Sequence, residues 1–158
     1  DYEKWKPIME DPSKYFATPA VNLVWAMKEA VRIIKEEGLE NRFKRHEKQA
    51  AAMRKALRSL GFEILAEEGH EAPTLSNVLY MEGIDDGEFR KLVQEEGIIV
   101  AGGLGAYAGK MFRIGHMGNA DMHDLVSSLA AIERTLYRMG AKVKFGTSVG
   151  VFMEEMMK

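Results

Sequence analysis

Apolar residues recur every three or four positions in three long stretches of the chain, residues 18–38, 39–60 and 122–139. This spacing places them along one side of a helix, so a helix is predicted over each stretch. Thr18 is expected to be the N-cap residue of the first helix, with Pro19 as its first helical residue.

Four shorter apolar segments lack this period and are typical of strands. They are residues 62–66, 75–81, 98–100 and 111–115. Asp85 and Glu88 have the spacing of a capping box, which predicts a short helix between the second and third strands. This order of elements predicts an α+β fold, a small and mostly antiparallel sheet covered on one face by helices.

The domain organisation is predicted from the same pattern. Residues 1–17 carry two prolines among aromatic residues and are expected to form an irregular entry segment. Residues 18–38 are expected to be a long connecting helix, and residues 39–145 the small α+β domain. Residues 146–158 are rich in methionine and weakly patterned, and they are interpreted as a tail.

Composition narrows the function classes. The net charge of −2 gives no broad surface for nucleic acid, and the absence of cysteine excludes disulfides, thiolate metal sites and a catalytic thiol. No apolar run is long enough to span a membrane and no signal peptide is recognised, so a cytoplasmic protein is predicted. Abundant Glu and Lys with scarce Asn and Gln favour a heat-adapted source.

Residues 99–118 are the strongest candidate for a functional site, because six of the fifteen glycines surround one arginine there. Residues 103–108 fit a relaxed dinucleotide-binding fingerprint, but that site needs a helix to follow and a strand is predicted here. Lys110 does not belong to a phosphate-binding P-loop, because Leu104 stands where the first glycine is required. Both nucleotide sites are therefore rejected.

Arg113 is the stronger candidate. In a strand it shares a face with Met111 and Gly115. Its planar guanidinium is suited to bidentate binding of a carboxylate, and the nearby glycines would leave room for a small ligand. An arginine on a solvated sheet face is the alternative interpretation.

Tyr15 and Thr18 form a second candidate anion site. Two hydroxyls beside a helix N-terminus can bind a phosphate, whereas the plain alternative is that Thr18 only caps its own helix. A metal site at His116 and His123 is not expected, because their spacing fits no known ligand pattern.

Three segments occur in the order in which a known family has them: Tyr15-x-x-Thr18-Pro, residues 37–41, and the glycine- and arginine-containing residues 102–118. In this combination the chain resembles the C-terminal part of alanine–glyoxylate and serine–glyoxylate aminotransferases. These enzymes are class V members of the fold-type I pyridoxal-phosphate enzymes. The resemblance covers residues 15–139.

The resemblance implies roles for particular residues. Arg113 matches the arginine that binds the substrate α-carboxylate, while Tyr15 and Thr18 match residues that reach the pyridoxal 5′-phosphate of the neighbouring subunit in a homodimer. The loop that lines this site would contain Gly102, Gly103 and Gly105. The implied fold is the small domain of fold-type I enzymes.

The resemblance also implies a missing part. The Schiff-base lysine, the aspartate at the pyridine nitrogen and the ring-stacking residue belong to a large domain that nothing in this chain resembles. We therefore expect a fragment or part of a longer aminotransferase for small amino acids and 2-oxo acids, inactive alone. A cysteine desulfurase is set aside because cysteine is absent. The alternative is a non-catalytic α+β module that binds a small carboxylate or mediates oligomerisation.

Overall fold

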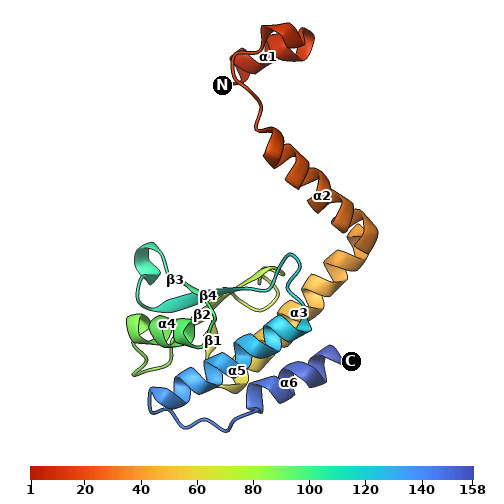
Figure 1. The fold of residues 1–158 in the computed structure, drawn as a ribbon. Helices are drawn as coiled ribbons and strands as arrows, with labels where there is room; N and C mark the ends of the chain where they lie inside the picture. The colour runs from red at the N-terminus through yellow and green to blue at the C-terminus, as the bar shows by residue number, and fades with distance from the viewer. The chain divides into compact units, whose positions relative to one another are not determined.

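The computed structural model describes residues 1–158, which form two units, residues 1–42 and residues 43–158. The first unit contains α1 (Tyr2–Glu10), the 3-10 turn η1 (Pro12–Lys14) and α2 (Val21–Glu37) (Figure 1). Helix α3 (Leu39–Ser59) begins in the first unit and continues into the second.

Helix α1 corrects the prediction of an irregular entry segment. The Asp1 side chain caps it by accepting a hydrogen bond from the Glu3 amide at 3.2 Å. Pro7 lies inside the helix, where its missing N–H removes only one backbone hydrogen bond from a short element. Trp5 packs edge-on against Phe16, with ring centroids 5.0 Å apart, and this contact joins α1 to the segment that follows.

Helix α2 begins at Val21, so the prediction that Thr18 caps it is wrong. Ala20 is the N-cap residue, and its ψ of 70° is not helical, which leaves Pro19 outside the helix. No side chain caps this end. Gly38 ends α2 as expected, with a φ of 82° and its amide bonded to the Ile34 carbonyl.

The second unit contains a four-stranded antiparallel sheet in the order β1-β2-β4-β3. Its strands are β1 (Glu63–Ile64), β2 (Leu75–Leu79), β3 (Ala101–Gly102) and β4 (Met111–Gly115). Strands β1 and β3 are shorter than predicted, and β3 begins after the apolar residues 98–100. In this register Ala101 lies opposite Arg113 and Gly102 lies opposite Phe112.

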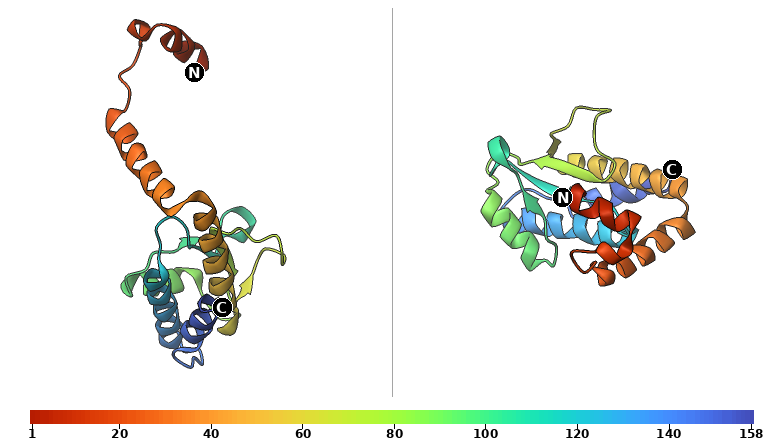
Figure 2. Two further views of the ribbon diagram at one scale, coloured as in Figure 1. Left: turned by 90° about the vertical axis from the view of Figure 1, so that its right-hand side faces the viewer. Right: turned by 90° about the horizontal axis from the view of Figure 1, so that it is seen from above.

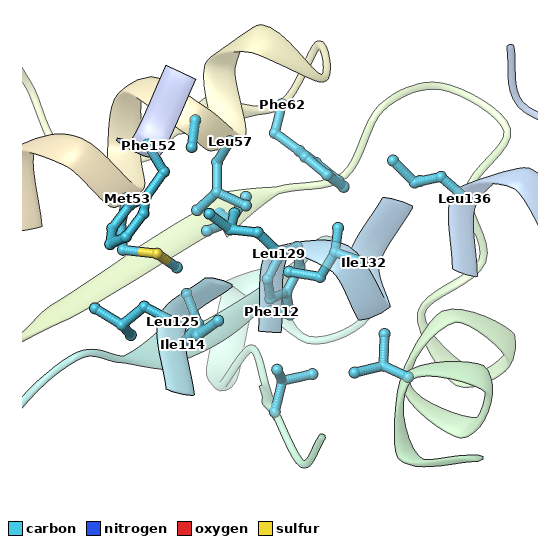
Figure 3. Close-up of a cluster of buried hydrophobic side chains, with 14 of the residues drawn as sticks. Met53, Leu57, Phe62, Phe112, Ile114, Leu125, Leu129, Ile132, Leu136 and Phe152 are labelled. Carbon is cyan, nitrogen blue, oxygen red and sulfur yellow. The ribbon is translucent and has the colours of Figure 1, made fainter. Parts of the chain in front are cut away.

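Helices cover one face of this sheet, which confirms the predicted fold class. They are α3, α4 (Asp86–Glu95), α5 (Met122–Arg138) and α6 (Thr147–Met156). Figures 1 and 2 show α5 and α6 side by side on the same side of the sheet. The side chains of Val78, Phe112 and Ile114 enter the core from the strands. Figure 3 shows Phe112 and Ile114 among Met53, Leu57, Leu129 and Phe152.

Helix α6 lies where the sequence predicted a tail. Phe152 is fully buried in the core, and burial of such a side chain contributes about 1.5–3 kcal/mol. The carboxylate of Glu133 on α5 holds the start of α6 by accepting hydrogen bonds from the Gly146 amide at 2.6 Å and from the Ser148 amide and hydroxyl at 2.7 Å. The two glycines of this segment and its weak apolar period hid its helical character.

Two other helices have an aspartate as their N-cap residue. Asp85 caps α4 by accepting from the Glu88 amide at 2.8 Å. Asp121, which directly precedes the predicted helix over residues 122–139, forms a reciprocal capping box with Asp124 at the start of α5. No helix combines the length and apolar character that a membrane span requires.

Candidate carboxylate-binding site

Arg113 is the central residue of β4 and points away from the helical core. Its neighbours Phe112 and Ile114 are buried in that core, so alternation along the strand places Arg113 on the opposite face. Its Nε donates a hydrogen bond to the Gly102 carbonyl at 2.9 Å. Neither terminal nitrogen bonds to another residue, so both keep N–H donors for a ligand.

Asn77 lies directly opposite Arg113 on β2. Its Oδ1 is buried and accepts no hydrogen bond. A buried acceptor without a donor costs about 1–3 kcal/mol, so it is rare in a folded protein. The sequence did not single out Asn77. The cross-strand register of the two predicted strands is the signal that would have found it.

Gly102, Gly103 and Gly105, which lie between the end of β3 and the turn η2, meet different constraints. A Cβ at Gly103 would lie 2.0 Å from the Tyr107 carbonyl oxygen, so the close approach of the loop's own backbone excludes any side chain there. Gly105 has a φ of 55° and begins the 3-10 turn η2 (Gly105–Tyr107), and a Cβ there would meet nothing within 4 Å. A Cβ at Gly102 would lie 3.3 Å from Nε of Arg90.

The segment that follows Arg113 is held by α3. His46 Nε2 accepts a hydrogen bond from the Gly118 amide at 3.0 Å, and Arg45 donates to the Gly118 carbonyl at 2.9 Å. Gln49 donates to the Ala120 carbonyl at 3.2 Å. These contacts join two segments about seventy residues apart, and the helical period of α3 gave no indication of them.

His116 is fully buried directly after β4. Its Nε2 lies 2.9 Å from the Ser76 hydroxyl, whereas Nδ1 has no hydrogen-bond partner. Burial, and then the positive charge of Arg54, lower the pKa of His116 to about 4. The imidazole is therefore neutral at pH 7.

Tyr15 and Thr18 lie in the first unit, and Arg113 lies in the second. Both residues are exposed, and neither hydroxyl makes a hydrogen bond. The amides of Val21 and Val24 at the start of α2 already donate to backbone carbonyls of Pro19 and Ala20. The two hydroxyls are donors that an anion would meet here.

Residues 2–123 match the family described as class-V aminotransferases. The chain belongs to this family. It is 39% identical to an uncharacterized aminotransferase of Methanocaldococcus jannaschii over 159 residues, which cover 100% of this chain and 41% of that relative. It is 33% identical to the serine–glyoxylate aminotransferase of Methylorubrum extorquens, over 94% of this chain and 37% of the relative.

The fold gives the same family. The crystal structure of ureidoglycine–glyoxylate aminotransferase from Bacillus subtilis matches with a TM-score of 0.92 and 28% identity, over 100% of this chain and 41% of that chain. This class-V chain thus has the fold of the small domain of fold-type I aminotransferases and spans about two fifths of its relatives' length. The family implies pyridoxal phosphate as the cofactor of its full-length members.

Proposed function

We propose that this chain is the C-terminal part of a pyridoxal-phosphate-dependent aminotransferase. The complete enzyme would transfer an amino group between a small amino acid, such as alanine or serine, and a 2-oxo acid such as glyoxylate or pyruvate. The observation that carries this proposal is Arg113, which offers two unpaired terminal nitrogens from the centre of a strand in a class-V fold. The relatives named for glyoxylate transamination support the substrate class.

Arg113 would bind the carboxylate common to all of these substrates. Its Nε is bonded to the Gly102 carbonyl, so the guanidinium is oriented before any ligand arrives. A charge-assisted hydrogen bond of this type contributes about 1.5–3 kcal/mol. A fixed carboxylate orients the bonds at the adjacent α-carbon, which is how binding at Arg113 would assist the reaction.

Tyr15 and Thr18 fit the phosphate of the implied cofactor, because their exposed hydroxyls have no partner and can donate to phosphate oxygens. In the proposed homodimer, each subunit would offer these hydroxyls to its neighbour's cofactor. Pyridoxal phosphate, when bound, supplies an electron sink for the substrate α-carbon. The lysine that holds it covalently would belong to the large domain, so this chain alone would not transaminate.

The test compares the full-length protein with this 158-residue chain. The full-length protein should transaminate glyoxylate or pyruvate with alanine or serine and show cofactor absorbance, and the chain alone should do neither. Arg113→Ala in the full-length protein should raise the apparent KM for the oxo acid by about tenfold or more. Arg58→Ala, which removes an exposed arginine on α3, is the matched control and should leave KM unchanged.

An unchanged KM in Arg113→Ala would contradict the assignment of this residue. If the full-length protein lacked transaminase activity while 2-oxo acids still bound through Arg113, the alternative of a non-catalytic carboxylate-binding module would replace this proposal.

A further inference from the structure

Three polar side chains form a closed network between the end of β2 and the first turns of α4. Asp86 is its centre and accepts from the Tyr80 hydroxyl at 2.9 Å, from Arg90 Nε at 3.0 Å and from Arg90 Nη2 at 2.7 Å. The Tyr80 ring packs against Phe89 and Phe112, with centroids 5.3 Å and 5.6 Å apart, so core side chains fix the hydroxyl's position.

The network remains intact at neutral pH. Hydrogen bonds from Arg90 lower the pKa of Asp86, and burial, followed by the hydrogen bond to Asp86, raises the pKa of the Tyr80 phenol. The carboxylate is therefore ionised and the phenol keeps the proton that it donates. Asp86 and Arg90 are spaced by four residues on one helix, and the guanidinium binds the carboxylate in a bidentate manner through Nε and Nη2.

This network lies directly against the backbone of Gly102. A Cβ on Gly102 would be 3.3 Å from Arg90 Nε, 3.4 Å from Arg90 Cζ and 3.6 Å from Asp86 Oδ1. Such distances leave no room for a larger residue without displacement of Arg90. The carbonyl of the same glycine accepts the hydrogen bond from Arg113 Nε at 2.9 Å. Gly102 thus contacts the network and also holds Arg113.

Gly102 also has backbone support from the neighbouring strand. Strand β3 is two residues long, lies at the edge of the sheet and pairs with β4 alone. The next residue continues this pairing, because the Gly103 amide donates to the Met111 carbonyl at 2.9 Å, and the turn η2 follows. The Gly102 carbonyl belongs to the same peptide group as the Gly103 amide, so its position depends on this bond to β4 and on the packing of Arg90 against Gly102.

We propose that Tyr80, Asp86 and Arg90 are positioning residues that hold Gly102 in place and thereby orient the Arg113 guanidinium for carboxylate binding. This inference rests on the role of Arg113 in the proposed function. The three residues contact neither substrate nor cofactor, and their effect would pass through the Gly102 carbonyl. A network that only stabilised α4 would leave Arg113 unaffected, and the two roles are separable by experiment.

The first test follows the Arg113 Nε–H signal by NMR in the ¹⁵N-labelled 158-residue chain, where Arg113→Lys identifies the signal by removing it. A hydrogen bond to Gly102 should protect this proton from exchange with water. Asp86→Asn and Arg90→Lys, which keep the side chains' approximate size, should each speed its exchange about three- to tenfold, the equivalent of most of one hydrogen bond.

Arg138→Ala is the matched control. Arg138 bonds to Glu95 and Glu96 at the other end of α4, so its loss loosens the same helix without touching Gly102. The control should leave the Arg113 exchange rate unchanged. Equal rates in the wild type and in both network variants, or an equal acceleration in Arg138→Ala, would overturn the proposal.

The second test uses the full-length enzyme and a double-mutant cycle. Asp86→Asn should raise the apparent KM for the oxo acid about three- to tenfold and change kcat less. In an Arg113→Ala background the same substitution should cause no further rise in KM, and a fully additive rise would show that Asp86 acts independently of Arg113. If Arg113→Ala alone left KM unchanged, the proposed function would fail, while the exchange measurement would still report whether the network orients the guanidinium.

Discussion

Ser148 donates two hydrogen bonds to the buried carboxylate of Glu133, one from its backbone amide and one from its hydroxyl, both at 2.7 Å. The Gly146 amide donates a third at 2.6 Å. The first amides of a helix lack partners within it, and α6 has no capping side chain at Gly146. The Glu133 carboxylate takes the place of such a cap.

Glu133→Ala should therefore destabilise the protein by about 3 kcal/mol, because it leaves buried donors unpaired. Urea unfolding would measure the loss. Glu154→Ala, which removes an exposed carboxylate from α6, is the matched control and should change the free energy of unfolding little. Equal effects of the two substitutions would show that the buried carboxylate does not hold the helix.

His116 should make stability depend on pH. Its pKa is about 4 in the folded protein against 6.5 for an ordinary histidine, so the unfolded chain takes up a proton first as the pH falls. Stability from this residue is therefore complete above about pH 6.5 and is lost as the pH falls toward 4. The loss between pH 7 and pH 5 should be about 2 kcal/mol.

Urea unfolding at both pH values would measure this loss. His116→Gln keeps a polar side chain near the Ser76 hydroxyl without a titrating imidazole, so its stability should fall less over the same interval. A variant whose stability fell as steeply as the wild type would assign the pH dependence to other groups.

Gly103→Ala and Gly150→Ala should have opposite effects. A Cβ at Gly103 would meet the Tyr107 carbonyl oxygen at 2.0 Å, so backbone must move, at a cost of about 1–3 kcal/mol. Gly150 lies inside α6 with nothing within 4 Å of a Cβ, and alanine there should stabilise the protein by about 0.5–1 kcal/mol. Thermal unfolding of both variants would test the two signs, and a stabilising Gly103→Ala would contradict the close approach.

Asn77→Asp should weaken carboxylate binding by the full-length enzyme. Asn77 lies opposite Arg113, and directly opposed side chains in an antiparallel sheet are close enough to form an ion pair. The new carboxylate would then compete with the ligand for the guanidinium, raising the apparent KM for the oxo acid. Asn77→Val provides no such competitor, so it is the control, and an equal KM rise in both variants would attribute the effect to the loss of the amide.

The sequence predicted the sheet and its covering helices because their signals are local. Short apolar segments without a helical period located β2 and β4, and Asp85 and Asp121 have the local hydrogen bonds of capping residues. Helices α1 and α6 were missed since Pro7 in the first and two glycines in the second disfavour helix locally. Contacts made after folding, such as Phe152 in the core and Glu133 at the start of α6, override those preferences.

The candidate site was predictable only in part. Arg113 stands out as one cation in an apolar strand, and its assignment as the carboxylate ligand remains a prediction. Arg113 lies opposite Asn77 because of the strand register, and its Nε donates to the Gly102 carbonyl on the edge strand. A local sequence pattern encodes neither contact. Thr18 was misplaced as a cap because the backbone at Ala20 delays the start of α2.

Arg113 shares its strand with Phe112 and Ile114, which are inserted into the hydrophobic core from the other face. The guanidinium therefore has no local hinge of its own, and the strand that carries it cannot be released without disrupting the core. Heating should consequently abolish ligand affinity and the folded core in one cooperative transition, so that a bound carboxylate would raise the melting temperature of the whole second unit.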